Sequence, residues 1–575
     1  MYLPFVIGIR SCIDYKIWED VYGDFLQMEE KILKILTELT ALKSRTGTSE
    51  ENSASDYIYE YIKGMEYFKK HSENCGIAEI ETDPMERHIP YGLVEGNSGN
   101  TVILGGHFDV VDEFDYGDAG ELAYSIGKDL EDALKKNPMT EDQQRDMDSG
   151  EWIWAKGAAD MKGGLAIHMV LLEEFSEQAL KGELEGSVLF MPVPDEESYS
   201  CGMRRAAGLL ADIKEKKKLD YKLLINPEPT DIVGDSQVMF LGTVGKTMPV
   251  IMVQGISSHI GHCFDGFNPL SVLTGIYQKT NGSLYFTDKY KDEATMPPTW
   301  LKMRDLKDVY DVSIPLRAAG YFTVLSLNSA PNSIMEKLSA ICSHVAQEEA
   351  EKLEYTYAQY KKINRFETKP SLGLRPKVYT FNRLRDELTE RYGDRFRRFY
   401  DRVYGEISDA IASGITNYPD GTISLMEKVL DFAGFTDPVV LLAFAPPYYP
   451  AVNGNMVNGK EFFAKKAYDI VAGISAEEGV DVTYQNFFMG ISDNSYTAVT
   501  GEDAGNGDFA AATPLWGHVY NIDFAAIKKI SVPSIIYGPI GKEYHKWSER
   551  VNRKSLLCTV PRVTRELIKQ AWHFK

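Results

Sequence analysis

The stretch TVILGGHFDVV at residues 101–111 decides the fold class of this chain. A short apolar run rich in β-branched residues ends at two glycines, and His107 and Asp109 follow at once. Similar runs occupy residues 188–191 and 223–225, and residues 165–180 have the spacing of a helix. Strands that alternate with helices predict an α/β fold with a mixed, mostly parallel sheet flanked by helices.

The pattern upstream and downstream of this stretch predicts further elements. Residues 25–45 and 53–68 carry apolar side chains at helical spacing. Residues 114–150 are acidic and polar, with one weak helical run at 130–134, so we expect a surface insertion.

A second unit begins near residue 243. We expect a strand at 248–254, a loop with His259 and His262, a helix at 269–278, a strand at 320–327 and a long helix at 332–360. This α+β unit, residues 243–385, is predicted to be inserted into a catalytic domain. Residues 1–242 are its N-terminal part, and residues 386–575 comprise a helical segment and its C-terminal part. The charged helical segment at 383–412 is left unassigned between the two units, and the chain with strand-like runs at 439–444 and 534–537 is expected to return to the first domain.

The composition excludes several classes of protein. The chain has 575 residues, which predicts several domains, and its 62 basic against 84 acidic residues give a net charge of −22. No basic cluster suited to nucleic acid or anionic lipid is visible, so neither partner is expected. The apolar residues 2–9 are too short for a membrane span and are interpreted as a strand or packing arm. Six widely spaced cysteines fit a reducing cytoplasm.

Residues able to bind divalent metal ions recur where apolar runs meet loops. Imidazole and carboxylate groups on preorganised loops, with one carboxylate shared between two ions, are the ingredients of a dinuclear hydrolytic site. The candidates in chain order are His107, Asp109, Asp160, the pair Glu196 and Glu197, Glu228 and His545.

The positions suggest roles for some of these residues. Asp109 can accept the second N–H of the His107 imidazole, which fixes the ring. Asp160 precedes Gly163 and Gly164, which permit close backbone approach, and is the natural bridging ligand. Of the two adjacent glutamates, one would bind metal and the other would transfer protons.

Each residue also has a structural interpretation. A single histidine after a strand is usually a hydrogen-bonded structural residue, an aspartate before glycines is often a cap, and a glutamate pair is usually solvated. Their joint occurrence after successive strands of one α/β pattern favours the metal site.

At these residues the chain resembles the co-catalytic zinc aminoacylase and carboxypeptidase family, which includes acetylornithine deacetylase, succinyl-diaminopimelate desuccinylase and peptidase T. The segments 446–450, 490–493 and 538–547 are most similar to its branch of arginine-utilisation proteins of the RocB type.

The resemblance implies a role for each residue. His107 and Glu228 would complete one metal site, Glu197 and His545 the other, and Asp160 would bridge them. Glu196 would be the general base, and Asp109 would hold the His107 ring in place. His259 would stabilise the oxyanion. Asn268 and Gly541 would bind the substrate. The resemblance also implies a cis peptide bond between Asp160 and Met161. It suggests a homodimer through the unit 243–385, and it leaves open whether His259 acts within its own chain or on a partner subunit.

The chain departs from the family pattern at two places. Asp112 stands where many relatives have a proline, and the acidic insertion widens the gap between His107 and Asp160. Where many relatives end a strand of the inserted unit with Asp-x-Arg, this chain reads LSL at 325–327. Recognition of a free amino-acid carboxylate is therefore not implied.

The leading prediction is a metallohydrolase that cleaves the amide bond of a small peptide or N-acyl amino acid, with a link to arginine catabolism through the resemblance alone. It would use two divalent ions, with Zn expected and Mn or Co as alternatives. The alternatives are a non-catalytic metal-binding or ligand-sensing protein that keeps the fold, and a constellation with a purely structural role.

Overall fold

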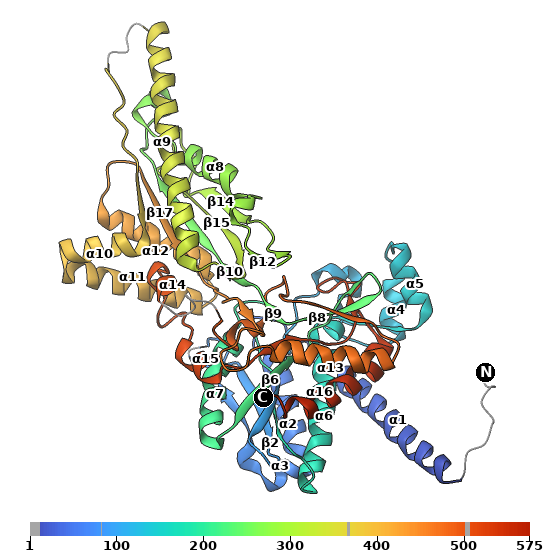
Figure 1. Cartoon of the computed structure of the whole chain (residues 1–575). Coiled ribbons are helices and arrows are strands. Elements are labelled where there is room, and N and C mark those ends of the chain that lie inside the picture. The colour runs from blue at the N-terminus through green and yellow to red at the C-terminus, as the bar shows by residue number, and fades with distance from the viewer. Residues whose placement is uncertain (1–11, 82, 365–368, 501–506) are drawn as a thin grey trace.

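Four apolar stretches form parallel strands at the centre of the first sheet (Figure 1). They are β5 (Ser187–Phe190), β3 (Asn100–Leu104), β6 (Asp220–Asn226) and β20 (Ser534–Ile536), which lie side by side in that order. The computed structural model describes residues 12–81, 83–364, 369–500 and 507–575. The apolar residues 2–9 lie outside this part.

Antiparallel neighbours extend the sheet at both edges. On one side β2 (His88–Val94) pairs with β5, and β1 (Cys75–Glu79) pairs with β2. On the other side β8 (Ser236–Phe240) pairs antiparallel with β20, and β19 (Val482–Gln485) lies parallel to β8. β7 (Ile232–Val233) pairs with β8 outside this order. The sheet is therefore mixed with a parallel centre, which confirms the predicted fold class.

Helices cover both faces of this sheet because its central strands are apolar on both sides. On β3, Val102 and Leu104 belong to one core and Ile103 to the other. The first core contains α1 (Cys12–Ala41), α2 (Glu51–Gly64), α6 (Gly163–Leu180), α13 (Phe463–Glu477) and α16 (Val560–Ala571). The second contains α7 (Cys201–Lys217) and α15 (Phe524–Ile530). This alternation is the pattern of a sheet buried between two helical layers.

A small three-stranded sheet joins distant parts of the chain at the edge of the first unit. Its strands are β21 (Gly541–Lys542), β22 (Arg550–Asn552) and β4 (Trp152–Trp154), all antiparallel to their neighbours. β4 leads into residues 158–162, and the loop between β21 and β22 carries His545.

The acidic insertion is more helical than its sequence indicated. It contains the 3-10 helix Phe114–Leu122, α4 (Lys128–Leu134) and α5 (Glu141–Ser149). Thr140 and Gln143 form a reciprocal capping box that starts α5. The expected weak run at 130–134 is α4, whereas α5 was not expected, because its mean hydropathy is low and few of its side chains are buried.

The second unit is built on a sheet of its own. Its strands are β10 (Gly245–Thr247), β11 (Pro249–Gln254), β14 (Thr299–Asp305), β15 (Arg317–Ser326), β16 (Lys377–Thr380) and β17 (Val439–Phe444). β17 pairs with β11 over six residues, from Pro249 to Gln254. The run at 439–444 therefore does not return to the first sheet, contrary to the expectation. It follows a helical excursion, and an apolar run alone does not indicate which sheet it joins.

Two helical layers enclose the second sheet (Figure 1). One contains α8 (Pro269–Thr280) and the long α9 (Pro331–Ile363). The other contains α10 (Phe381–Tyr392), α11 (Asp394–Ala412) and α12 (Tyr418–Ala433). The charged segment that the sequence left unassigned is thus the outer layer of the second unit, which reaches beyond the expected boundary at residue 385.

The remaining α-helices and β-strands are short. They are α3 (Glu66–Lys70), α14 (Asp508–Ala512), the ladder of β12 (Lys289–Tyr290) with β13 (Glu293–Ala294), and the ladder of β9 (Gly242–Thr243) with β18 (Val452–Asn453). Among the helices that the structure describes, none combines the length and the apolar character needed to cross a bilayer.

Candidate metal centre

The candidate ligands gather at one edge of the first sheet because they follow parallel strands. His107 follows β3, Glu196 and Glu197 follow β5, Glu228 follows β6, and His545 lies in the chain that continues from β20. The carboxyl ends of neighbouring parallel strands meet at one edge, which is where α/β proteins bind ligands.

Asp160 reaches this edge from a different direction. It lies in the irregular turn Ala158–Lys162, between β4 and α6, and its peptide bond to Met161 is cis, as predicted. The N-terminus of α6 lies against the loop that carries Glu228: a Cβ on Gly164 would stand 2.3 Å from the Pro227 carbonyl oxygen. A glycine is therefore needed at this contact.

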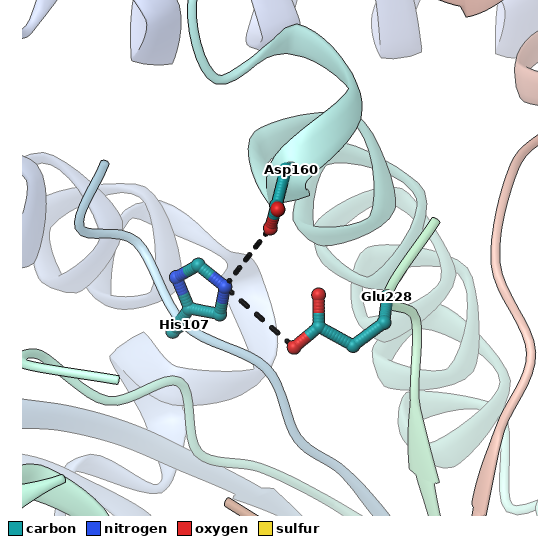
Figure 2. Close-up of side chains that lie close together, drawn as sticks. All are labelled: His107, Asp160 and Glu228. Carbon is teal, nitrogen blue, oxygen red and sulfur yellow. Dashed lines mark ion pairs between the residues drawn. The ribbon is translucent and has the colours of Figure 1, made fainter. Parts of the chain in front are cut away.

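Figure 2 shows one group of three ligand-type side chains. The His107 Nε2 atom lies 3.3 Å from Asp160 Oδ1 and 3.6 Å from Glu228 Oε1. The imidazole and the Glu228 carboxylate are buried. One imidazole nitrogen and two carboxylate oxygens thus converge on a common point.

A second group shares Asp160 with the first. The His545 Nε2 atom lies 3.1 Å from Asp160 Oδ2 and 2.8 Å from Glu197 Oε1. The two oxygens of one carboxylate therefore face two different histidines. In each group the three candidate ligand atoms lie within 4.8 Å of one another, so each could hold a metal ion.

The contacts of His107 prepare its Nε2 atom for a ligand. The Nδ1 atom lies 3.0 Å from the main-chain oxygen of Asp109, which fits an Nδ1–H donor and leaves a lone pair on Nε2. The Asp109 carboxylate lies further away, at 3.4 Å, and accepts hydrogen bonds from the main-chain nitrogens of Glu196 and Glu197, both at 3.1 Å. Asp109 thus ties the loop after β3 to the loop after β5.

The donor set fits cations better than internal hydrogen bonds. Glu197 Oε1 is buried and accepts no hydrogen bond from the described residues, although the His545 nitrogen is 2.8 Å away. Burial raises the pKa of Glu228 to about 7. Burial alone would also raise the pKa of Asp160, but the two histidines bring it below its ordinary value. Several carboxylates packed in a buried space need positive charge beside them.

Glu196 stands beside these groups without belonging to either. Its Oε2 atom lies 4.0 Å from His107 Nε2, and burial raises the pKa of its carboxyl group well above the ordinary value. A buried carboxylate with a raised pKa next to a candidate metal centre is suited to proton transfer near neutral pH.

Sequence reasoning missed three groups near the centre, of which Glu549 and Asp493 are buried and Lys246 is half-buried. Glu549 accepts hydrogen bonds from the main-chain nitrogens of Ala159 and Asp160, at 3.0 and 3.1 Å, so it holds the turn that presents Asp160. Asp493, whose pKa burial raises to about 7, and Lys246, whose pKa burial lowers to about 8, both interact electrostatically with Glu196. Asp493 lies in a segment that carried the family resemblance, but nothing in the spacing of its neighbours distinguished it from an ordinary turn residue.

The other three predicted site residues, Gly541, His259 and Asn268, are not part of either group of candidate ligands. Gly541 lies on β21, where a Cβ would stand 3.0 Å from Ala159 and 3.1 Å from Pro229, so it is adjacent to the centre. His259 is exposed in the second unit and its Nδ1 accepts a hydrogen bond from the Gly261 nitrogen. Asn268 caps α8 through the Leu270 nitrogen, at 3.0 Å. Within the described residues, no hydrogen bond or ion pair joins His259 or Asn268 to the centre.

The sheet, its helical layers and the His/carboxylate clusters at its carboxyl edge define a metallohydrolase of α/β class. The chain belongs to peptidase family M20/M25/M40, whose model matches residues 103–570. It is therefore a hydrolase of a metallopeptidase family.

Individual relatives span nearly the whole chain. The uncharacterized protein YqjN of Bacillus subtilis (strain 168) is 28% identical over 537 residues, which cover 91% of this chain and 93% of that protein. Protein RocB of the same organism is 28% identical over 542 residues, which cover 92% and 93%. A solved tripeptidase from Staphylococcus aureus subsp. aureus Mu50 is 13% identical with a TM-score of 0.49, over 95% of this chain and 98% of that one.

Proposed function

We propose that this chain is a dinuclear metal-dependent hydrolase that cleaves the amide bond of a small peptide or N-acyl amino acid. The observation that carries the proposal is the sharing of Asp160, whose two oxygens face His107 and His545 at 3.3 and 3.1 Å. One bridging carboxylate with an imidazole and a further carboxylate on each side is a donor set suited to two divalent ions.

In this proposal the ligands divide into two sets. His107 and Glu228 hold one ion, Glu197 and His545 hold the other, and Asp160 bridges them. Imidazole and carboxylate donors accept Zn, Mn or Co, and we propose Zn as the resident metal. When bound, the ions supply Lewis-acid polarisation of the amide carbonyl and a lowered pKa for the attacking water.

The protein side chains carry the protons. Glu196 takes a proton from the attacking water and delivers it to the leaving nitrogen, because its carboxylate lies beside the centre without being needed as a ligand. Asp109 keeps His107 in its tautomer and fixes the backbone of the two glutamates. His259 of the second unit stabilises the oxyanion that develops on the carbonyl oxygen.

The substrate class is proposed from the site and the relatives together. The family is one of peptidases, and Protein RocB is one of the relatives that span most of this chain. We therefore propose small amides, with arginine-containing dipeptides and N-acyl arginines among the first compounds to test.

A matched pair of variants tests the proposal. The metal-loaded protein is incubated with dipeptides and N-acyl amino acids, and released amino acids are followed by mass spectrometry, beside Glu196→Gln and the exposed-site control Glu183→Gln. We expect release by the wild type and the control, a loss of about 10²–10⁴-fold in Glu196→Gln, and two bound metal ions in all three.

Two results would contradict the proposal. Equal rates of amino acid release by Glu196→Gln and the wild type would show that Glu196 is not the general base. Two bound metals with no release from any amide would instead favour the non-catalytic metal-binding protein.

A further inference from the structure

The acidic insertion packs against the segment that carries His545. We define the His545 loop as residues 543–549, between β21 and β22. Two of its non-glycine residues have left-handed backbone conformations, Glu543 with φ 55° and His545 with φ 62°. Residues other than glycine rarely adopt this conformation, so it persists only where surrounding contacts impose it.

The His545 side chain is only partly enclosed by the protein. Its side chain is 49% exposed, whereas that of His107 is 1% exposed. The loop therefore depends on contacts elsewhere to hold the imidazole at 2.8 Å from Glu197.

Arg550, directly after the loop, makes one group of these contacts. Its guanidinium group is fully buried, 0% exposed, and pairs with three carboxylates. The distances are 2.7 Å to Asp146, 2.9 Å to Asp142 and 2.6 Å to Glu543. Two of the three acids belong to α5 and the third belongs to the His545 loop, so one cation joins the insertion to the loop.

A second connection runs through the capping box of α5. Gln143 uses its Oε1 atom to accept the Thr140 main-chain N–H at 2.9 Å, and its Nε2 atom donates to Glu543 at 2.8 Å. Gln143, a member of the capping box that starts α5, therefore also holds the left-handed residue Glu543 of the loop.

Two further residues, Lys542 and Trp547, join the same surfaces. The Lys542 ammonium group lies 2.9 Å from Asp142 and 2.8 Å from Asp146. Near the other end of the loop, the Trp547 main-chain nitrogen donates to the Asp115 carboxylate of the insertion. The loop is thus held by the insertion near both of its ends.

We infer that α5 is a positioning element for the second metal site, and that Asp142, Gln143 and Asp146 act as positioning residues for His545 through Arg550 and Glu543. This inference rests on the proposed dinuclear function, since it assigns a role to α5 in only one of the two sites. His107 and Glu228 of the first site follow β3 and β6 and make none of these contacts with α5. Asp160 belongs to both sites, and its turn is held by Glu549 at the other end of the loop from Glu543.

The test measures metal binding directly. Equilibrium dialysis against Co²⁺, with visible absorption as the readout of ligand geometry, is applied to the full-length wild type, to Asp142→Asn/Asp146→Asn and to Asp142→Asn alone. The control is Asp148→Asn, the same change on an exposed position of α5. We expect the double variant to bind one Co²⁺ equivalent as the wild type does and a second about 10–100-fold more weakly, the usual effect of removing groups that orient a ligand.

Asp142→Asn alone should give an intermediate loss, and the control should bind both equivalents normally. The melting temperature of the metal-free proteins separates positioning from folding. Unchanged affinity for the second equivalent, or equal weakening of both equivalents with a lowered melting temperature, would overturn the inference. A wild type that binds a single equivalent would contradict the dinuclear proposal itself.

Discussion

At the scale of single residues, the function of a side chain depends on neighbours that are remote in sequence. His107 could be recognised as a candidate ligand from its place after an apolar run. Its tautomer depends on the Asp109 main-chain oxygen at 3.0 Å, which a sequence does not show. Glu549 was missed for the same reason: its hydrogen bonds go to residues 159 and 160, some 390 positions earlier. The sequence does not distinguish a carboxylate that becomes buried from one that stays solvated.

A buried histidine outside the centre gives a pH prediction. His168 on α6 bonds to the Gly105 carbonyl oxygen at 3.1 Å, and burial lowers its pKa to about 3. The unfolded chain, with a pKa near 6.5 at this residue, binds the proton first as pH falls. This residue therefore stabilises the fold above pH 6.5, and the contribution is lost as pH falls from 6.5 towards 3.

We expect His168→Gln to show a shallower loss of stability on acidification. The free energy of unfolding, measured by urea denaturation between pH 7 and 4, should fall less steeply than in the wild type, by up to about 1.4 kcal/mol per pH unit. The exposed-histidine control His344→Gln should keep the wild-type slope. If the free energy of unfolding of His168→Gln falls with pH as steeply as that of the wild type, the His168 imidazole is not responsible for the loss of stability on acidification.

At the scale of elements, local periodicity predicted most helices and strands, whereas the partners of the strands were set by tertiary contacts. The strands at 102–104, 188–191 and 223–225 were expected and form the parallel centre of the first sheet. The strand at 439–444 was expected and joins the second sheet instead. Strand formation depends on nearby side chains, but strand pairing depends on the path of the intervening chain.

The close approach of α6 to the Glu228 loop gives a second prediction. A methyl group on Gly164 would meet the Pro227 carbonyl oxygen at 2.3 Å, so Gly164→Ala must displace the helix or the loop. We expect a loss of about 1–3 kcal/mol in the free energy of unfolding, together with weaker binding of one metal equivalent. Gly64→Ala is the control, because a Cβ there meets nothing within 4 Å. Equal stability of the two variants would disprove the steric argument.

At the scale of the whole molecule, the centre and His259 belong to different units. The candidate ligands lie at the edge of the first sheet, and His259 is exposed in the unit built on the second sheet. The proposed oxyanion role therefore requires the second unit to close over the first, or a second copy of the chain to supply the imidazole.

Kinetics and complementation distinguish these arrangements. We expect His259→Ala to lower kcat by about 10²–10³-fold, the usual loss for an oxyanion donor, with binding of both metal equivalents unchanged. Mixing His259→Ala with Glu196→Gln should restore part of the activity if the histidine acts on a partner subunit, and should restore none if it acts within one chain. An unchanged kcat in His259→Ala would show that His259 does not stabilise the oxyanion.

The sequence by itself determined the α/β class, and it predicted the candidate ligands that follow the strands of the first sheet. Periodicity and the order of strand-end motifs are local properties, and parallel strands bring their carboxyl ends to one edge in any fold of this class. Only the tertiary structure decided that Asp160 faces both histidines, that the segment 383–412 covers the second sheet, and that α5 binds the His545 loop. Such contacts join residues that are remote in sequence, 404 positions apart for Asp146 and Arg550, and their geometry depends on packing that no local pattern encodes.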